Sequence, residues 1–266
     1  RCRARGAGRG GGGRGRRHGA ATGRVLSMAE GLIAAAGLLC LLAVGLTIPL
    51  VIAVRRRERR RTDRLQAWAR ANGWTVTPKP VVHWRARLPG GDRGVVTVAV
   101  SGAVSGRPVS VAEYAVSDVH VTPTPDGLGG TTTSTTITTH HFTVAVAALS
   151  RPMPSVAVER RGTASRLARA VLGPSETATG NADFDRAFRI RTADPAAVRW
   201  WCTPSLIDAH LRWQIPDWSL TGTDVLTYRG GRLDPSTIPA EAGRITFLAA
   251  ELDRGGAGYS PSVRRG

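Results

Sequence analysis

The longest hydrophobic segment of the chain lies near its N-terminus. Residues 31–54 form an apolar run of 24 residues without a charged side chain. As a helix rising 1.5 Å per residue, this run spans about 36 Å, more than the roughly 30 Å hydrocarbon core of a bilayer. It also exceeds the apolar core of a secretory signal peptide, about 7–15 residues, and no small-x-small cleavage site follows it. The pattern predicts a transmembrane helix over residues 28–54.

A strongly basic segment follows the apolar run. It continues in helical register to Asn72-Gly73, a typical helix stop, and so predicts a juxtamembrane helix over residues 55–73. If translation begins at Met28, the other flank of the span carries no Arg or Lys, and the positive-inside rule places the rest of the chain in the cytoplasm. We expect the basic side chains to set this topology and to contact anionic lipid headgroups. They are Arg55, Arg56, Arg57, Arg59, Arg60, Arg61 and Arg64.

Beyond residue 73, alternating β-branched residues predict strands. Residues 95–104 and 109–116 are joined by the turn Ser105-Gly106-Arg107-Pro108 and predict a hairpin. Residues 118–139 are rich in Thr, Gly and Pro, and we expect a flexible loop there, although a β-branched Thr run also suits an edge strand. Further strands are expected at 74–76, 142–149 and 155–160, and a second hairpin at 219–221 with 225–228.

The remaining segments predict short helices. Asp194-Pro195 and Thr203-Pro204 each place a capping side chain before a proline at the first helical position. Helices are also expected over 164–172 and 240–252. The chain lacks a repeated β-α-β pattern, which argues against a doubly wound parallel sheet. We therefore expect an α+β protein: one N-terminal transmembrane helix, then a soluble domain over 74–252 with a mostly antiparallel sheet and short packing helices.

The charge is concentrated at one end of the 266-residue chain, whose formal net charge is +18. Residues 1–64 carry 15 Arg and 3 acidic residues, a net +12, which leaves +6 for the remainder. Nucleic acid is therefore not an expected partner of the domain. The Arg/Gly-rich residues 1–27 are expected to be disordered and to precede a true start at Met28, and residues 253–266 to form a disordered tail. Three cysteines cannot form a disulfide framework.

The sequence contains few motifs that indicate catalysis or metal binding. The sequence lacks the Gly-x-Ser-x-Gly, His-Glu-x-x-His, Cys-x-x-Cys and P-loop motifs. His140 and His141 point to opposite faces if they lie on a strand, so they do not share one metal. Cys202 follows two tryptophans and suits a buried apolar position. We expect no catalytic residue, no metal and no cofactor.

Two functions are left open by the sequence. The first is a single-pass membrane protein with a cytoplasmic, non-enzymatic interaction or scaffold domain, whose partners are the lipid bilayer, anionic headgroups and other membrane proteins. The second is a membrane-tethered enzyme or small-ligand sensor. Its pocket would be formed by the aromatic residues of the C-terminal third: Trp200, Trp201, His210 and Trp218.

The C-terminal third also resembles a known protein family. The run 184–190 followed by Asp194-Pro195 and Thr203-Pro204 resembles a bacterial membrane-anchored domain family of unknown function, with Cys202 where that family has Leu. Together with Gly73-Trp74 after the anchor, the chain is similar to uncharacterised actinobacterial single-span membrane proteins. The resemblance implies a membrane-anchored architecture and supplies no functional residues.

Overall fold

The computed structural model describes residues 45, 47, 49, 51–125, 131–161, 176–192 and 194–258. The chain divides into two compact units, Arg1–Arg61 and Thr62–Gly266. Residues 1–27, the predicted helix over 164–172 and residues 259–266 of the predicted tail lie outside the described residues. No helix among the described residues has the length and apolarity to cross a membrane. Most of the predicted span over 28–54 lies outside those residues, so the span stays a prediction.

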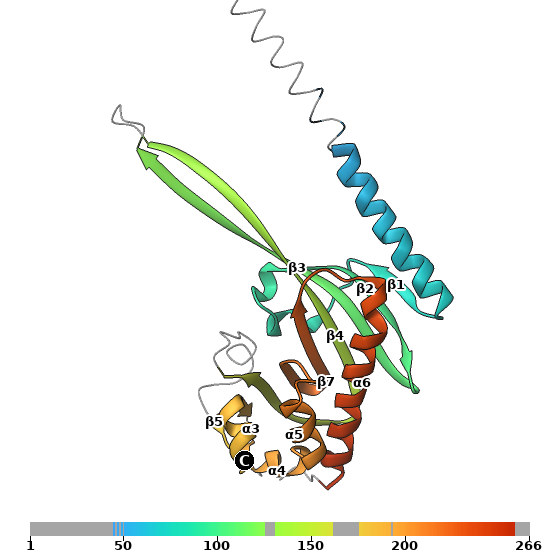
Figure 1. Ribbon diagram of the computed structural model, residues 1–266, viewed down its shortest axis with the longest axis vertical. Helices are drawn as coiled ribbons and strands as arrows, with labels where there is room; N and C mark the ends of the chain where they lie inside the picture. The colour runs from blue at the N-terminus through green and yellow to red at the C-terminus, as the bar shows by residue number, and fades with distance from the viewer. Residues whose placement is uncertain are drawn as a thin grey trace, which may run out of the picture. The chain divides into compact units, whose positions relative to one another are not determined.

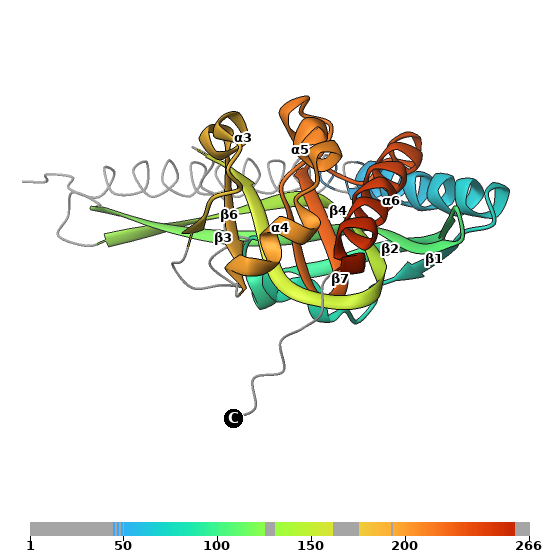
Figure 2. The same ribbon diagram turned by 90° about the horizontal axis from the view of Figure 1, so that it is seen from below.

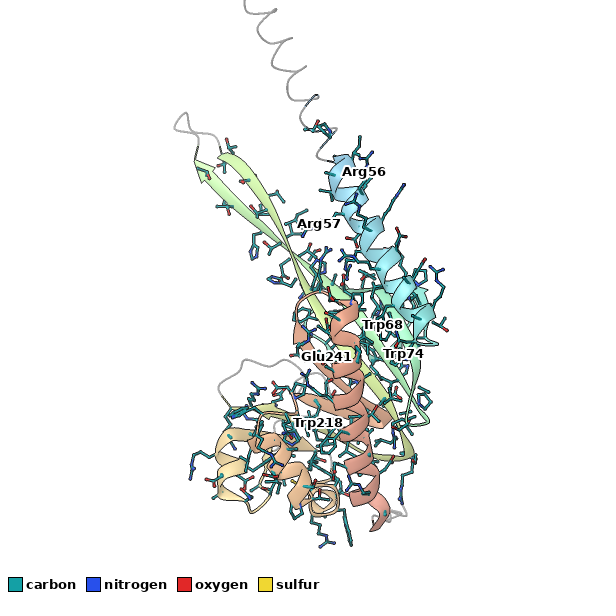
Figure 3. The ribbon with its side chains drawn as sticks, turned by 45° about the vertical axis from the view of Figure 1, so that its right-hand side comes forward. Arg56, Arg57, Trp68, Trp74, Trp218 and Glu241 are labelled. Carbon is teal, nitrogen blue, oxygen red and sulfur yellow. The ribbon has the colours of Figure 1, made fainter. Side chains whose placement is uncertain are left out.

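Residues 51–71 are helical, and the helix ends in a Schellman motif. The Trp74 amide donates to the Ala69 carbonyl at 2.8 Å, and the Gly73 amide donates to the Arg70 carbonyl. Gly73 adopts φ +70°, which a residue without a Cβ reaches at little cost. The rings of Trp68 and Trp74 then pack edge to face, with centroids 5.5 Å apart (Figure 3). The chain is thereby turned directly from the helix into the first strand.

The second unit is built on a seven-stranded antiparallel sheet (Figure 1). The strand order is β1-β2-β3-β4-β6-β5, and β7 also pairs with β4. The mostly antiparallel α+β architecture predicted from the sequence is confirmed. The strands are β1 (Thr75–Pro78), β2 (Val95–Val104), β3 (Arg107–Pro125), β4 (Thr131–Arg160), β5 (Glu176–Thr177), β6 (Phe188–Thr192) and β7 (Trp218–Gly230).

Strand β4 joins the two halves of the sheet. Along β4, the pairing with β3 ends at Ala147 and the pairing with β6 begins at Val156, while β7 runs along the other side. Pro152 and Pro154 lie in the interval between these two pairings, where a missing amide N–H breaks no ladder bond with β3 or β6. The two strands expected at 142–149 and 155–160 are therefore parts of one strand.

Strand β7 is a single strand, and the expected hairpin of 219–221 with 225–228 is wrong. The strand pairs with β4 on both sides of an irregular stretch in which Met153 lies opposite Gly222. Between the Ala148–Asp224 and Val156–Leu220 pairs, β4 advances by eight residues and β7 by four, so the extra residues lie in β4. Gly222 has φ +60°, and the chain continues past it without reversing. A Gly-Thr-Asp sequence is compatible with either outcome, which is why the sequence pattern alone was misleading.

Helices cover one face of the sheet (Figure 2). Asp194 and Thr203 cap their helices as predicted, accepting from the amides of Ala196 and Leu206. The main core lies beneath these helices and includes Leu65 and Ala69 of the N-terminal helix, so the folded unit begins before residue 74. The helices are α3 (Ala182–Ala187), α4 (Val198–Trp201), α5 (Pro204–Leu211) and α6 (Ile238–Gly255).

A smaller core lies on the opposite face of the sheet. It is covered by two 3-10 turns, η1 (His83–Arg87) and η2 (Gly91–Arg93). The buried Tyr114 hydroxyl donates to the carbonyls of Pro89 and Gly91, at 2.9 and 2.7 Å, and fixes this segment on the sheet. Both faces of the central strands are therefore covered.

Candidate functional site: a two-stranded arm

Strands β3 and β4 continue well beyond the rest of the sheet as a two-stranded ribbon (Figure 1). The β2 pairing ends at Ala115 and the β7 pairing ends at Phe142, whereas β3 and β4 stay in register out to Pro125 and Thr131. We call residues 116–125 and 131–140 the arm. At about 3.3 Å per residue it is roughly 30 Å long. The flexible loop expected over 118–139 is thus wrong for residues 118–125 and 131–139, because the β-branched threonines favour extended backbone.

The arm has two chemically different faces. Side chains alternate along each strand, and directly paired residues share a face. One face carries Val119, Val121 and Ile137, which are 59%, 58% and 65% exposed, surrounded by threonines. The other face carries Asp118 and the two histidines His120 and His140. The arm therefore presents an apolar stripe to solvent without contributing these side chains to either core.

Two carboxylates hold the base of the arm, one on each face. On the apolar side, Glu113 is buried and accepts from the Leu233 amide at 2.9 Å and from the Thr97 hydroxyl at 3.3 Å. The ring of His141 lies 3.4 Å from the same carboxylate. On the polar side, Asp118 lies 3.7 Å from His140 and 4.0 Å from Arg93, beside a hollow of about 180 Å³. The sequence pattern does not single out Glu113 as a functional residue.

The direction in which each backbone N–H and C=O group of the arm points follows from the hairpin turn between β2 and β3. Val104 and Arg107 flank the two-residue Ser105-Gly106 turn, so the groups of Arg107 point toward β2. Because successive residues alternate, odd-numbered residues of β3 point away from β4 and odd-numbered residues of β4 point away from β3. The Gly231 amide, which donates to the His141 carbonyl at 2.8 Å, confirms this direction in β4.

The outer edge of β4 is therefore open along the arm. No described strand pairs with it beyond Phe142, and its side chains carry no charge, proline or glycine between residues 131 and 139. The outer edge of β3 differs, because Pro123 and Pro125 have no amide N–H to offer there. Natural proteins usually protect an exposed edge with charge, proline or a bulge. The residues whose N–H and C=O groups face outward on β4 are Thr131, Thr133, Thr135, Ile137 and Thr139.

The arginines predicted to bind lipid headgroups lie on the helix over 51–71. Arg61 is half-buried and pairs with Glu58 at 3.1 Å, and the others are exposed. Figure 3 shows Arg56 and Arg57 projecting from this helix. Their exposure leaves them accessible to a membrane surface, and their binding of lipid stays a prediction.

The aromatic residues predicted to form a pocket are packed into the core. Trp201, Trp218 and His210 are each at most 1% exposed, and the Trp201 and Trp218 rings meet edge to face at 5.6 Å. His210 accepts from Trp218 Nε1 at 2.9 Å through Nε2, while its Nδ1 lies 2.7 Å from the Leu206 carbonyl. Burial lowers the pKa of His210 to about 4, which keeps the ring neutral. Trp200 alone reaches the surface, so the four residues do not line a shared cavity.

The other candidate residues are buried in the fold or hydrogen-bonded to its backbone. Burial raises the pKa of the Cys202 thiol to about 12, with a smaller contribution from Asp185, so the thiol stays protonated and a poor nucleophile at neutral pH. Asp185 accepts from the Thr179 and Gly180 amides and holds the start of α3. His140 and His141 lie on opposite faces of β4, as predicted. Among the described residues, no three His, Cys, Asp or Glu side chains group as metal ligands.

Comparison with known proteins adds little. No family model matches the sequence, and no curated protein matches it either. Among solved structures, the chain is similar to the crystal structure of the mycobacterial trehalose monomycolate transport factor A, TtfA, at 10% sequence identity and a TM-score of 0.45. The match covers 75% of this chain and 96% of that chain. A similarity of this size assigns no function.

Proposed function

We propose that the chain is a membrane-tethered, non-enzymatic interaction protein whose cytoplasmic domain uses the arm as its binding surface. The observation that carries the proposal is the open edge of the arm together with its apolar stripe, whose residues Val119, Val121 and Ile137 belong to neither core. Isolated two-stranded ribbons are only marginally stable in water, and an unprotected edge invites pairing with another chain. A long arm with these properties is best explained by a partner that adds to it.

The tether follows from the apolar run over 31–54 and the arginines after it. The charge asymmetry supports a cytoplasmic domain, because the rule counts Arg and Lys near the ends of a span. Near an anionic leaflet each exposed arginine adds about 1 kcal/mol of attraction, so residues 55–64 would also hold the domain close to the bilayer. Anionic headgroups and other membrane proteins are the partners this arrangement favours.

The buried acidic groups support the interpretation that the protein is not an enzyme. Glu241 accepts from Arg229 at 2.6 Å and from Arg244 at 3.0 Å, on α6 (Figure 3). Glu251 accepts from Ser205 at 3.2 Å, also on α6. With Glu113 at the base of the arm, these carboxylates are used to join elements of the fold. The alternative of an enzyme or sensor loses its expected pocket, since His210 and two of the tryptophans fill the core.

Site-directed photo-crosslinking in cells tests the proposal. A photoreactive residue is placed in the full chain at Thr135 on the arm edge, at Ile137 on its apolar face, or at Gly243 on the exposed side of α6 as a control. A Cβ at Gly243 meets nothing within 4 Å, so the control position accepts a larger side chain. We expect adducts from both arm positions and none from residue 243. If neither arm position forms an adduct in cells, the arm is not a binding surface.

A further inference from the structure

We propose that the arm pairs with the arm of a second copy of this chain. The two β4 strands would lie antiparallel, edge to edge, and form a continuous four-stranded sheet in the order β3-β4-β4-β3. This inference rests on the proposed function, because it names the partner that the arm binds. The arm extends clear of the body of its own domain, so a second arm reaches the β4 edge without crossing either core (Figure 1).

The hydrogen-bonding pattern of the edge is complementary to itself. Antiparallel pairing about a two-fold axis through Thr135 places Thr135 opposite its counterpart in the second copy. Thr131 then lies opposite Thr139, and Thr133 opposite Ile137. Every outward-facing residue of the edge meets another outward-facing residue, and each pair exchanges two N–H···O=C bonds. Shifting the register by two residues leaves one end of the edge unpaired, so the axis through Thr135 is the register that uses the whole edge.

The charge distribution suits a second copy. The β4 edge has no charged side chain between residues 131 and 139, so two copies meet without repulsion. The nearest acidic group, Asp118, lies on β3 and would stay on the far side of each ribbon. A charged peptide partner would find no complementary charge along this edge. The composition therefore favours pairing of like with like through β-branched threonines, which form good cross-strand pairs.

The proline-bearing edge explains why pairing would stop at two copies. Pro123 and Pro125 lack amide N–H groups at two of the five outward-facing positions of the β3 edge, so a third strand would meet an interrupted ladder there. Because only the β4 edge is uninterrupted along the described arm, pairing through it favours a closed, two-fold dimer over a growing fibre. Pairing also places Val119, Val121 and Ile137 of both copies on the same face. A four-stranded sheet with one apolar face is more stable than either two-stranded ribbon.

Matched proline substitutions test which edge is used. Thr135→Pro and Val121→Pro lie opposite each other in the arm, and both remove an N–H that points away from the partner strand. Neither therefore breaks a bond between β3 and β4. The mass of the full-length protein in detergent is measured by sedimentation equilibrium over a range of concentrations. We expect a dimer for the wild type and for Val121→Pro, and dimerisation weakened at least about tenfold for Thr135→Pro, which removes two intermolecular bonds.

Cysteine cross-linking tests the register without disturbing the ladder. Thr135→Cys and Val121→Cys are made in a background with Cys2, Cys40 and Cys202 changed to Ala, and oxidised with copper phenanthroline. In the proposed dimer the two copies of residue 135 have Cα atoms about 5.5 Å apart, within disulfide reach. The two copies of residue 121 are separated by three strand spacings, about 14 Å. We expect a covalent dimer for Thr135→Cys and none for Val121→Cys.

The outcomes separate this inference from the proposed function. A wild type that stays monomeric, or a dimer that persists equally in Thr135→Pro, overturns self-pairing. If the arm forms photo-adducts with a different protein while the purified chain is monomeric, the proposed function holds and the second copy is the wrong partner. Arm-dependent binding of a monomer to phosphatidylcholine vesicles would assign the apolar stripe to lipid and likewise overturn self-pairing. If no photo-adduct forms at either arm position, both the proposed function and the self-pairing of arms are wrong.

Discussion

Trp218 donates its indole N–H to Nε2 of His210, 2.9 Å away, inside the main core. The bond requires an unprotonated Nε2, so the other ring nitrogen, Nδ1, carries the proton and donates to the Leu206 carbonyl. Three rings surround this histidine, with Phe184 and Phe188 at centroid distances of 5.4 and 5.3 Å. The imidazole is therefore a structural hydrogen-bonding group that the core holds in its neutral form.

This arrangement predicts a loss of stability in mild acid. The pKa of His210 is about 4 in the folded chain and near 6.5 when unfolded, so the unfolded state binds the proton first. Keeping His210 neutral contributes about 3 kcal/mol to the free energy of unfolding at pH values above 6.5. This contribution is lost as the pH falls toward 4. His210→Leu should lower stability at pH 7 by about 1–3 kcal/mol, because Trp218 loses its acceptor, yet flatten the pH profile. Urea unfolding at several pH values measures both effects, and parallel profiles would contradict the assignment.

Two glycines predict opposite effects of the same substitution. Gly94 has φ −86°, which alanine adopts freely, but an added Cβ would lie 1.9 Å from the Tyr114 hydroxyl oxygen. Gly94→Ala should therefore destabilise the domain by about 2 kcal/mol by displacing the ring. Gly243→Ala, in the exposed middle of α6, should stabilise it by about 0.5–1 kcal/mol. Equal effects of the two substitutions on thermal unfolding would argue against the placement of Tyr114.

Sequence patterns predicted local features better than long-range ones. The helix caps at Asp194 and Thr203 and the hairpin of 95–104 with 109–116 were correct, because each depends on a few neighbouring residues. The turn is shorter than predicted, since Arg107 and Pro108 are already paired with β2. The arm was missed because threonine is compatible with both loop and strand. Only pairing in register over its whole length decides between them, and that pairing is a relation between distant segments. The β-branched run and the alternation of Val119 with Val121 were the signals available.

The same limit applies to the residues of the candidate pocket. A histidine and three tryptophans in one segment are compatible with a ligand site or with a core. What decides is whether His210 has partners, and both partners are set by folding: the Leu206 carbonyl one turn earlier and Trp218 on β7. The buried Glu113 gave no sequence signal, because its partners Thr97 and Leu233 come from other elements.

The N-terminal helix predicts where the folded unit begins. Leu65 is 2% exposed and belongs to the main core, although it lies before the boundary at residue 74 expected from the sequence. Leu65→Ala in the full chain should lower the free energy of unfolding by about 3 kcal/mol. Gln66→Ala, at an exposed position on the same helix, should change it by less than about 0.5 kcal/mol. If the two variants unfold alike in urea, the helix does not belong to the cooperative unit.

The basic segment predicts the orientation of the chain in the membrane. Arg55, Arg56, Arg57, Arg59 and Arg60 are exposed, whereas Arg61 is half-buried beside Glu58, so the first five can be changed with least effect on the helix. In the wild type, a C-terminal alkaline phosphatase fusion should be inactive and a C-terminal green fluorescent protein fusion bright. Changing the five to Gln leaves only Arg61 and Arg64 of the charge that opposes translocation, and phosphatase activity should appear. Changing the same five to Lys keeps the charge and should leave both reporters as in the wild type. An unchanged reporter pattern in the Gln variant would show that these arginines do not set the topology.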